Sequence, residues 1–401
     1  IQGDVGSGKT MVAAAAAYCA VQNGHQAALM APTEILAAQH AKTLSALLAP
    51  LGVSIALLTG SMTAAQRRPV LAGLSDGSID LVIGTHALFS EKTAFHDLGL
   101  VIADEQHRFG VAQRARLAAK GRSPHLLVMS ATPIPRTLAL LAYGDLNVSV
   151  LDELPPGRKP VETFLVGESM RKRMHAFIRK QCAEGHQVYI VCPAVEDTGD
   201  ESLKSAEVWA ETLRTVVLPD LRVGLLHGKM SGEEKEAALT AFSRGETDVL
   251  VCTTVVEVGV DVPNATLMVV ENAERFGLAQ LHQLRGRVGR GDAQAYCVLF
   301  SASRNPDTLA RLKTLCATND GFQIAEADLA QRGPGDFLGN RQHGLPLFKM
   351  ANLQMDLQTL QDAQRAASET ISSPDALSAP ELAPLRARID ALFQRQDMAL
   401  N

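Results

Sequence analysis

The chain has 401 residues, of which 46% are hydrophobic and 20% charged, and its formal net charge is −5 at pH 7. This length provides about two or three domains with full hydrophobic cores, and the composition excludes a collagen-like, low-complexity or membrane-spanning chain. Mild acidity excludes a generally basic nucleic-acid coat protein, so any contact with DNA must be local. The 6 cysteines form no C-x-x-C pair, which indicates free thiols in a reducing cytoplasm.

The first motif with a chemical meaning lies at the start of the chain. It fits G-x-x-x-x-G-K-[ST], a nucleotide-binding P-loop, in the run Gly3-Asp4-Val5-Gly6-Ser7-Gly8-Lys9-Thr10. Glycines let the backbone N–H groups face a polyphosphate at the positive end of the alanine-rich helix that follows. We expect Lys9 to reach the β- and γ-phosphates and the Thr10 hydroxyl to bind Mg²⁺. Only Ile1 and Gln2 precede the motif, so the chain looks like a piece of a longer protein.

A second, acidic site narrows the chemistry, because a P-loop alone does not separate kinases, GTPases, transporters and helicases. The apolar run 98–103 is typical of a buried strand. It delivers Asp104-Glu105-Gln106-His107 at its carboxyl end, where open α/β sheets place their chemistry. We expect Asp104 to hold Mg²⁺ and Glu105 to polarise the attacking water.

Short apolar runs alternate with helical stretches on both sides of a proline-rich break at residues 151–160. Before the break we expect strands of one parallel sheet at residues 26–31, 54–58, 81–84, 98–103 and 125–129. After it we expect a second αβ series without a P-loop, with strands at 161–166, 187–192, 222–226, 247–252, 266–270 and 295–300. The spacing of Leu353, Leu357 and Leu360, and the run 383–393, predict two packed helices near the end of the chain.

In their order along the chain, the motifs resemble those of superfamily 2 helicases. Two segments are similar to the family's DNA-contacting motifs: the first contains Pro32 and Thr33, and the second contains Thr85 and His86. A third segment, which contains Ser130 and Thr132, is similar to the motif that couples hydrolysis to DNA movement. The resemblance implies that the first two segments grip the phosphate backbone of one strand. It also implies that the substrate of the P-loop is ATP.

The second series carries the remaining motifs of that family. Residues 283–290 resemble Q-x-x-G-R-x-G-R, in which Arg287 and Arg290 would reach the γ-phosphate across the cleft between two domains. A guanidinium suits this role because its fork of N–H groups stabilises charge on phosphoryl oxygens. The resemblance of residues 253–261 implies that Thr254 touches DNA. It implies that Gly259 and Asp261 lie at the nucleotide.

Later residues narrow the resemblance to the RecG family of bacterial branched-DNA helicases. Residues 319–344 are similar to a translocation motif, a helical hairpin and loop, that this family shares with the transcription-repair coupling factor. By position, its working residues would be Arg311, Arg332 and Gln342. The coupling factor is the nearest alternative. Gln106 and the spelling Arg332-Gly333-Pro334-Gly335 favour the RecG family.

The resemblance implies an α/β fold of two tandem RecA-like P-loop domains, with parallel sheets flanked by helices, and a helical C-terminal extension. We expect a first RecA-like domain at residues 1–150, a linker at residues 151–160 and a second RecA-like domain at residues 161–305. The translocation hairpin and loop follow at residues 306–350, and a C-terminal helical segment at residues 351–401. We expect the C-terminal helices to close over the motor domains.

The implied activity is ATP-dependent translocation on, and unwinding of, branched double-stranded DNA, such as stalled forks and Holliday junctions, in recombination and repair. The implied cofactors are ATP and Mg²⁺. We expect a monomer in the bacterial cytoplasm, without membrane contact, that meets single-stranded-DNA-binding protein at forks. A hypothesis of another class, a P-loop switch that uses nucleotide only to change partners, predicts slow hydrolysis that DNA does not stimulate.

Basic side chains are clustered in two parts of this mildly acidic chain. One cluster lies between Gln106 and Arg136 and the other at residues 171–180. Such runs are as often solvated surfaces as phosphate contacts. If they track phosphates, binding weakens steeply with added salt and shows little sequence preference.

Overall fold

The computed structural model describes residues 1–104, 117, 120–130, 147–153, 159–193, 201–253, 262–332, 357–371 and 379–399. Contacts group two parallel sheets and their helices into one compact unit, and the residues from Glu326 onwards into a second unit. We call the described residues 1–153, built around one sheet, the first lobe. We call the described residues 159–325, built around the other sheet, the second lobe.

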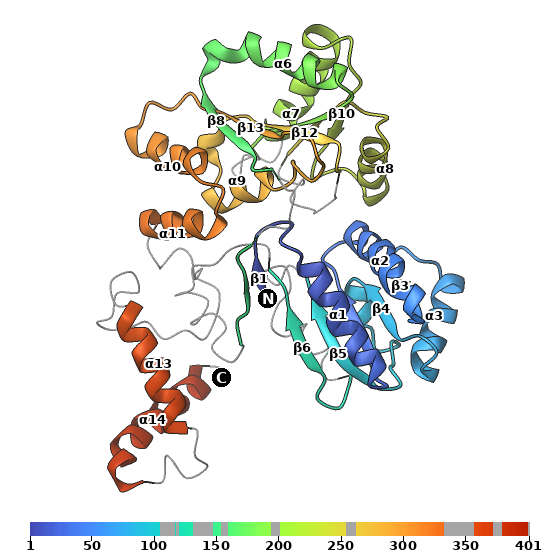
Figure 1. Ribbon diagram of the computed structural model, residues 1–401, viewed down its shortest axis with the longest axis vertical. Coiled ribbons are helices and arrows are strands. Elements are labelled where there is room, and N and C mark those ends of the chain that lie inside the picture. The colour runs from blue at the N-terminus through green and yellow to red at the C-terminus, as the bar shows by residue number, and fades with distance from the viewer. Residues whose placement is uncertain are drawn as a thin grey trace. The chain divides into compact units, whose positions relative to one another are not determined.

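The first lobe is centred on a sheet with the strand order β3-β4-β2-β5-β6, in which every neighbouring pair is parallel (Figure 1). In chain order, the strands are β2 (Gln26–Met30), β3 (Ile55–Leu58), β4 (Leu81–Gly84), β5 (Leu98–Ala103) and β6 (His125–Val128). All five predicted strands are thus confirmed, to within about two residues at their ends.

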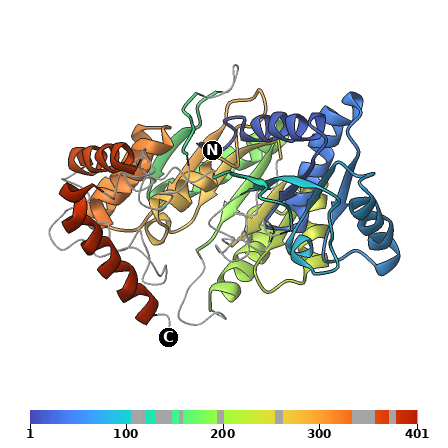
Figure 2. The ribbon, with the colours of Figure 1, turned by 90° about the horizontal axis from the view of Figure 1, so that it is seen from below.

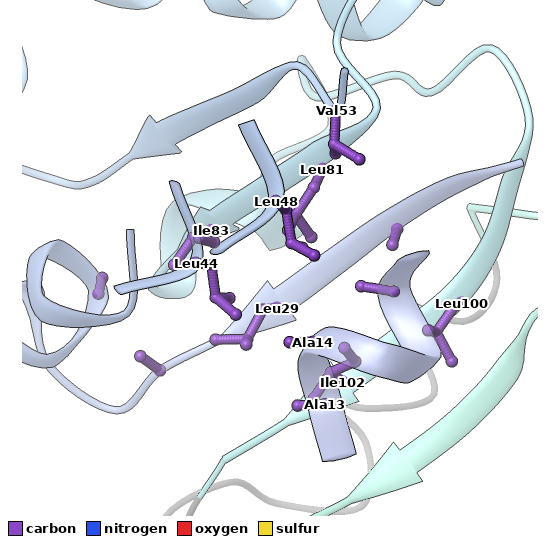
Figure 3. Close-up of a cluster of buried hydrophobic side chains, with 14 of the residues drawn as sticks. Ala13, Ala14, Leu29, Leu44, Leu48, Val53, Leu81, Ile83, Leu100 and Ile102 are labelled. Carbon is purple, nitrogen blue, oxygen red and sulfur yellow. The ribbon is translucent and has the colours of Figure 1, made fainter. Parts of the chain in front are cut away.

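Both faces of this sheet are buried, which explains why its strands are continuous apolar runs rather than alternating ones. Helices α1 (Lys9–Gln22) and α2 (Glu34–Leu48) cover one face, where Leu29 and Ile102 pack against Ala13 and Leu44 (Figure 3). Helix α3 (Ala64–Asp76) covers the other face, against which Met30 and its neighbours pack. Figure 2 shows the same helices and sheet turned by 90°.

The strand that leads into the P-loop is two residues long. This strand, β1 (Gln2–Gly3), pairs in parallel with β7 (Val150–Leu151), and Gln2 also bridges to Ser130, just beyond the end of β6. The strand that leads into the P-loop therefore has β7 on one side and the segment after β6 on the other. Leu151, which the proline pattern placed in the linker, lies in β7.

The second lobe has a parallel sheet with the strand order β10-β11-β9-β12-β13-β8. Its strands are β8 (Glu162–Val166), β9 (Gln187–Val191), β10 (Val223–Leu226), β11 (Val249–Cys252), β12 (Ala265–Val270) and β13 (Tyr296–Phe300). The predicted second series is thus confirmed as well. Its helices are α6 (Arg171–Ala183), α7 (Glu201–Thr212), α8 (Gly232–Ser243), α9 (Leu278–Arg285) and α10 (Pro306–Ala317). Helix α11 (Gly321–Arg332) begins in the second lobe and continues past Ala325 into the second unit.

Two further helices follow at the end of the chain, α13 (Leu357–Ile371) and α14 (Ala383–Ala399). They confirm the two helices predicted there, although Leu353 lies outside the described residues. Their closure over the motor domains stays a prediction. Within the described ranges, the helices fall short of the length and apolar character needed to cross a bilayer.

Candidate functional site

The P-loop curls because two of its glycines have left-handed backbone conformations. Gly6 has φ 77° and Gly8 has φ 92°, values that side chains other than glycine rarely tolerate. Helix α1 begins directly afterwards, at Lys9. The Lys9 ammonium donates hydrogen bonds to the carbonyl oxygens of Gly3, at 2.9 Å, and Asp4, at 2.7 Å. Loop, lysine and helix start therefore form one compact cradle.

Three observations show that this cradle fits a polyphosphate. The N-terminus of α1 has no capping side chain and no acidic residue in its first turn, so its N–H groups and positive dipole end are left for an anion. The Ser7 Oγ is buried, and no hydrogen-bond partner for it lies among the described residues. A Cβ at Gly3 would lie 2.5 Å from that hydroxyl, so only glycine leaves room for it.

The predicted metal carboxylate, Asp104, follows the end of β5, and its backbone N–H donates to the Met30 carbonyl oxygen at 2.9 Å. Its Oδ2 is hydrogen-bonded to Nε2 of His40 on α2, at 2.8 Å. Both side chains are largely buried, so the histidine fixes the direction of the carboxylate. This positioning role of His40 was not predicted. Its spacing from the buried Leu36 and Leu44 places it on the core-facing side of α2, which is the signal that could have found it.

Among the described residues, no group of three or more His, Cys, Asp or Glu side chains could hold a metal ion. A magnesium ion does not need such a group, because it usually keeps several waters and is bound through one or two carboxylates and the phosphates of the substrate. The Thr10 hydroxyl and the Asp104 carboxylate therefore suit Mg²⁺ better than a transition metal.

Loops after three neighbouring strands of the first lobe meet at the carboxyl edge of the sheet. The Thr33 side chain caps α2 after β2, and the next residue, Glu34, accepts a hydrogen bond from the Ser61 backbone N–H at 2.9 Å. A Cβ at Gly60 would lie 3.1 Å from the His86 ring. The segments predicted from Pro32–Thr33 and Thr85–His86 are thus brought together. The loop at residues 59–63 completes the group and was missed.

The individual side chains in these segments differ in exposure. His86 is exposed, whereas Thr85 is 2% exposed, and its hydroxyl is buried inside the lobe. Ser130 is also buried, and its backbone exchanges hydrogen bonds with Ile1 and Gly3 beside the P-loop. The geometry therefore favours His86 for contact with a ligand at this edge, and it favours Ser130 for contact with the strand that carries the P-loop.

Helix α9 brings the predicted arginine motif against the P-loop. His282 Nε2 and Asp4 Oδ1 are hydrogen-bonded at 2.7 Å. A Cβ at Gly286 would lie 2.8 Å from the Val5 Cβ, so glycine is needed for this approach. Arg287 is 6% exposed, and the Arg290 Nε donates to the Gly286 carbonyl oxygen at 3.3 Å.

The hydrogen bonds of His282 determine which of its ring nitrogens carries the proton. An Arg285 N–H donates to His282 Nδ1 at 2.9 Å, and a guanidinium can only donate. Nδ1 is therefore the acceptor, and the proton on Nε2 is donated to Asp4. Burial acts to raise the pKa of Asp4, but the hydrogen bond from His282 and neighbouring charges outweigh it, so that pKa lies below its usual value.

The same network continues into the predicted translocation hairpin. The Arg285 guanidinium donates to the carbonyl oxygens of Leu315, at 2.7 Å, and Thr318, at 2.8 Å, at the end of α10. Arg311 on α10 donates to the carbonyl oxygens of Phe276 and Glu274, in the turn before α9. The connection that His282 and Arg285 make between Asp4 and Leu315 was not predicted, because these residues are distant in sequence and no motif links them.

Several predicted site residues cannot be placed. The positions outside the described residues are Glu105, Thr132, Thr254, Gly259, Asp261 and Gln342. Arg332 is the last residue of α11, and its side chain is not described. The roles of these seven residues stay predictions.

The basic cluster on α6 is engaged within its own lobe. Arg171 is paired with Glu168 and Glu271, and Arg179 is paired with Asp220. These contacts favour a structural role over phosphate tracking for this cluster. All six thiols are free, as predicted, and burial raises the pKa of Cys192 to about 12.

Three family models match the chain in succession. The DEAD/DEAH box helicase model matches residues 1–141, and the helicase conserved C-terminal domain model matches residues 170–292. A third model, for the C-terminal part of domain 3 of the ATP-dependent DNA helicase RecG, matches residues 318–398. The first model covers the sheet of the first lobe, the second covers strands β9 to β12 of the other sheet, and the third covers α11 and most of the final helices.

Curated relatives named ATP-dependent DNA helicase RecG match almost the whole chain. The relative from Synechocystis is 53% identical over 383 residues, which is 95% of this chain and 46% of the relative. The relative from Bacillus subtilis is 48% identical over 386 residues, which is 96% of this chain and 57% of the relative. The chain thus spans about half the length of the curated relatives it matches.

Solved structures agree with these matches. A structure of RecG bound to a three-way DNA junction superimposes with a TM-score of 0.75 at 47% identity, covering 90% of this chain and 47% of the other. Dbp5 of S. cerevisiae bound to RNA and ADP BeF3 superimposes with a TM-score of 0.57 at 16% identity, covering 91% and 88% of the two chains, which shows the shared fold alone. The predicted tandem RecA-like fold is confirmed, and the chain belongs to the RecG family of ATP-dependent DNA helicases.

Proposed function

We propose that the protein is an ATP-driven motor that translocates on double-stranded DNA and unwinds branched DNA. The observation that carries the proposal is the largely buried chain of hydrogen bonds from Asp4 in the P-loop, through His282 and Arg285, to Leu315 and Thr318 at the end of α10. A site that only bound and hydrolysed a nucleotide would need no such connection. A motor needs one, because domain closure on ATP must move the element that engages DNA.

The chemistry proposed for the cradle uses residues on both lobes. Lys9 and the P-loop N–H groups bind the phosphates of ATP, and Thr10 and Asp104 hold Mg²⁺, with His40 orienting the carboxylate. When bound, the metal would neutralise charge on the phosphate oxygens. Glu105 positions and polarises the attacking water. Arg287 and Arg290 stabilise the charge that develops on the transferred phosphoryl group.

The carboxyl edge of the first lobe is the proposed contact for the DNA backbone. Pro32, Thr33 and the exposed His86 lie there beside the loop at residues 59–63. The polar side chains of Thr33 and His86 can contact phosphates and sugars without reading bases, which suits movement along any sequence. The related RecG structure is bound to a three-way junction, which supports branched DNA as the substrate of this protein too.

Finer parts of the proposal come from family membership. They are a monomeric state, a cytoplasmic location in a bacterium, action at stalled forks and Holliday junctions, and an encounter there with single-stranded-DNA-binding protein. Sedimentation of the full-length protein with and without forked DNA tests the first of these.

The deciding experiment measures ATP hydrolysis by the full-length protein and by a Lys9→Ala variant, with and without forked DNA, at low and moderate salt. The proposal expects strong stimulation by forked DNA that disappears in the variant and weakens as salt rises. A rate that DNA leaves unchanged would refute it and would favour a nucleotide switch. Binding of RNA polymerase would instead favour a transcription-repair coupling factor.

A further inference from the structure

Two segments of the chain fold into the same succession of strand, loop, helix and strand (Figure 1). Equivalent residues of the two segments always differ in residue number by the same amount, which is the difference between Leu58 and Leu226. In the first lobe the unit is β3, α3 and β4, and in the second lobe it is β10, α8 and β11. Residues identical at equivalent positions include Leu57 and Leu225, Gly60 and Gly228, Met62 and Met230, Asp80 and Asp248, and Thr85 and Thr253.

The equivalence extends to individual hydrogen bonds in the loop after the first strand. The residue that follows each strand, Thr59 or His227, points its backbone N–H at the methionine sulfur three residues later, at 3.4 Å in both lobes. The next helix then begins with a complete capping box in both, formed by Thr63 in the first lobe and Ser231 in the second. The two loops therefore have one geometry despite different sequences.

A basic side chain from the first turns of the helix reaches back into each loop. In the first lobe, the Arg67 guanidinium donates to the carbonyl oxygen of Gly60. In the second lobe, the Lys235 ammonium donates to the carbonyl oxygen of Gly228 at 2.7 Å. Arg67 and Lys235 occupy equivalent positions but differ in shape, so what the two lobes share is a charge-assisted hydrogen bond to the loop glycine.

The position of the loop in the first lobe indicates what this bond is for. Residues 59–63 lie against Glu34 and His86, in the proposed DNA contact. By the same residue-number difference, Thr254 in the second lobe is the equivalent of His86. Both positions were assigned to DNA separately, from different motifs. The loop at residues 227–231 is therefore the counterpart, in the second lobe, of the loop that lies against His86, whereas Thr254 itself lies outside the described residues.

We propose that Arg67 and Lys235 are equivalent positioning residues, each of which holds the loop of its lobe, residues 59–63 or 227–231, in the shape that contacts the DNA backbone. The inference rests on the proposed function. Because the two loops have the same geometry, both lobes contact the DNA backbone in the same way, and this stays so when the lobes move. The hydrogen bonds that Arg67 and Lys235 make to the described residues go to the loop glycines and not to the nucleotide cradle.

The test uses the full-length protein and compares removal of each bond with its exchange. Arg67→Met and Lys235→Met keep an apolar stem and remove the donor, whereas Arg67→Lys and Lys235→Arg install the donor that the other lobe uses. Arg68→Met and Arg244→Met are matched controls, because each removes one exposed positive charge from the same helix or its C-cap. The readouts are the forked-DNA concentration that gives half-maximal ATP hydrolysis, the rate without DNA and the melting temperature.

Each methionine variant at position 67 or 235 should raise the half-maximal DNA concentration about tenfold, the factor expected for one charge-assisted hydrogen bond. The rate without DNA should stay within about twofold of the unmodified protein, and the exchange variants should behave like it. Methionine variants that match the controls, or exchange variants as defective as the methionine variants, would overturn the inference alone. Should a methionine variant fail to fold, the exchange variants still decide. If DNA fails to stimulate the unmodified protein, the proposed function is refuted first.

Discussion

The hydrogen bond between Asp4 and His282 should be worth about tenfold in the rate of DNA-stimulated ATP hydrolysis. Hydrogen bonds to charged groups contribute about 1.5–3 kcal/mol. The His282 side chain is 4% exposed, but the Asp4 side chain is 22% exposed, so water replaces part of the lost bond. We therefore expect the lower end of that range, about 1.5 kcal/mol, which corresponds to about a tenfold change.

A double-mutant cycle measures this contribution without assigning the whole loss to one partner. Asp4→Ala, His282→Ala and the double variant are compared with the unmodified protein by kcat/KM for ATP at saturating forked DNA. Each single variant should lower kcat/KM about tenfold or more. The kcat/KM of the double variant should be only slightly below that of the less active single variant. Effects that add to within about 0.5 kcal/mol would refute the reasoning.

The chain offers a matched control for that cycle. His25 and Asp97 form a histidine–carboxylate pair at 2.9 Å in the first lobe, and about half of each side chain is exposed. Exposed pairs contribute about 0–1 kcal/mol, and this pair is not linked to the P-loop. The cycle for His25→Ala and Asp97→Ala should therefore show no coupling in kcat/KM. Coupling there would mean that the assay reports general stability.

Three further outcomes are expected. His40→Ala should lower kcat for ATP hydrolysis and raise the Mg²⁺ concentration required, about tenfold or more as for a lost ligand-orienting bond, with DNA affinity unchanged by fluorescence anisotropy; unchanged Mg²⁺ dependence would contradict the orienting role. Leu29→Ala should lower the free energy of unfolding by about 3–5 kcal/mol in urea titration, whereas Leu51→Ala, at a 53% exposed site, should cost under about 0.5 kcal/mol; equal costs would contradict the assigned core. In the native protein the exposed Cys19 should react with a thiol reagent at the rate of a free cysteine, and Cys192 should react only on unfolding, because burial raises its pKa to about 12; fast reaction of Cys192 would contradict its burial.

The sheets could be predicted because their central strands are buried on both faces and therefore appear in the sequence as apolar runs. β2 and β12 are examples in which every residue is buried. The cradle could be predicted because its glycines, lysine and helix start are contiguous, so that one local pattern contains the whole device. Family membership followed from the order of such patterns, and the matching relatives confirm it.

The rest of the site could not be predicted because its parts are distant in sequence and chemically ordinary. His282 is one histidine in a helix until α9 packs beside Asp4, and Arg285 occupies a variable position of the motif at residues 283–290. Thr85 shows a second limit, since the motif predicts a segment that contacts DNA but does not show that the Thr85 side chain is buried, and the role of Thr85 stays a prediction. The duplicated loops escaped notice because Arg67 and Lys235 are equivalent in position but not in identity.

The pairing of β1 with β7 has a consequence for how the protein folds. Gln2 can take its place only after Val150 has been made, so the first strand of the chain waits for a partner about 150 residues away. Strand pairs of such separation form late, since the entropy of closing the loop must be met before the contact contributes. During synthesis the central strands can assemble while the phosphate cradle is still open. Nucleotide affinity should therefore be among the last properties that a refolding chain regains.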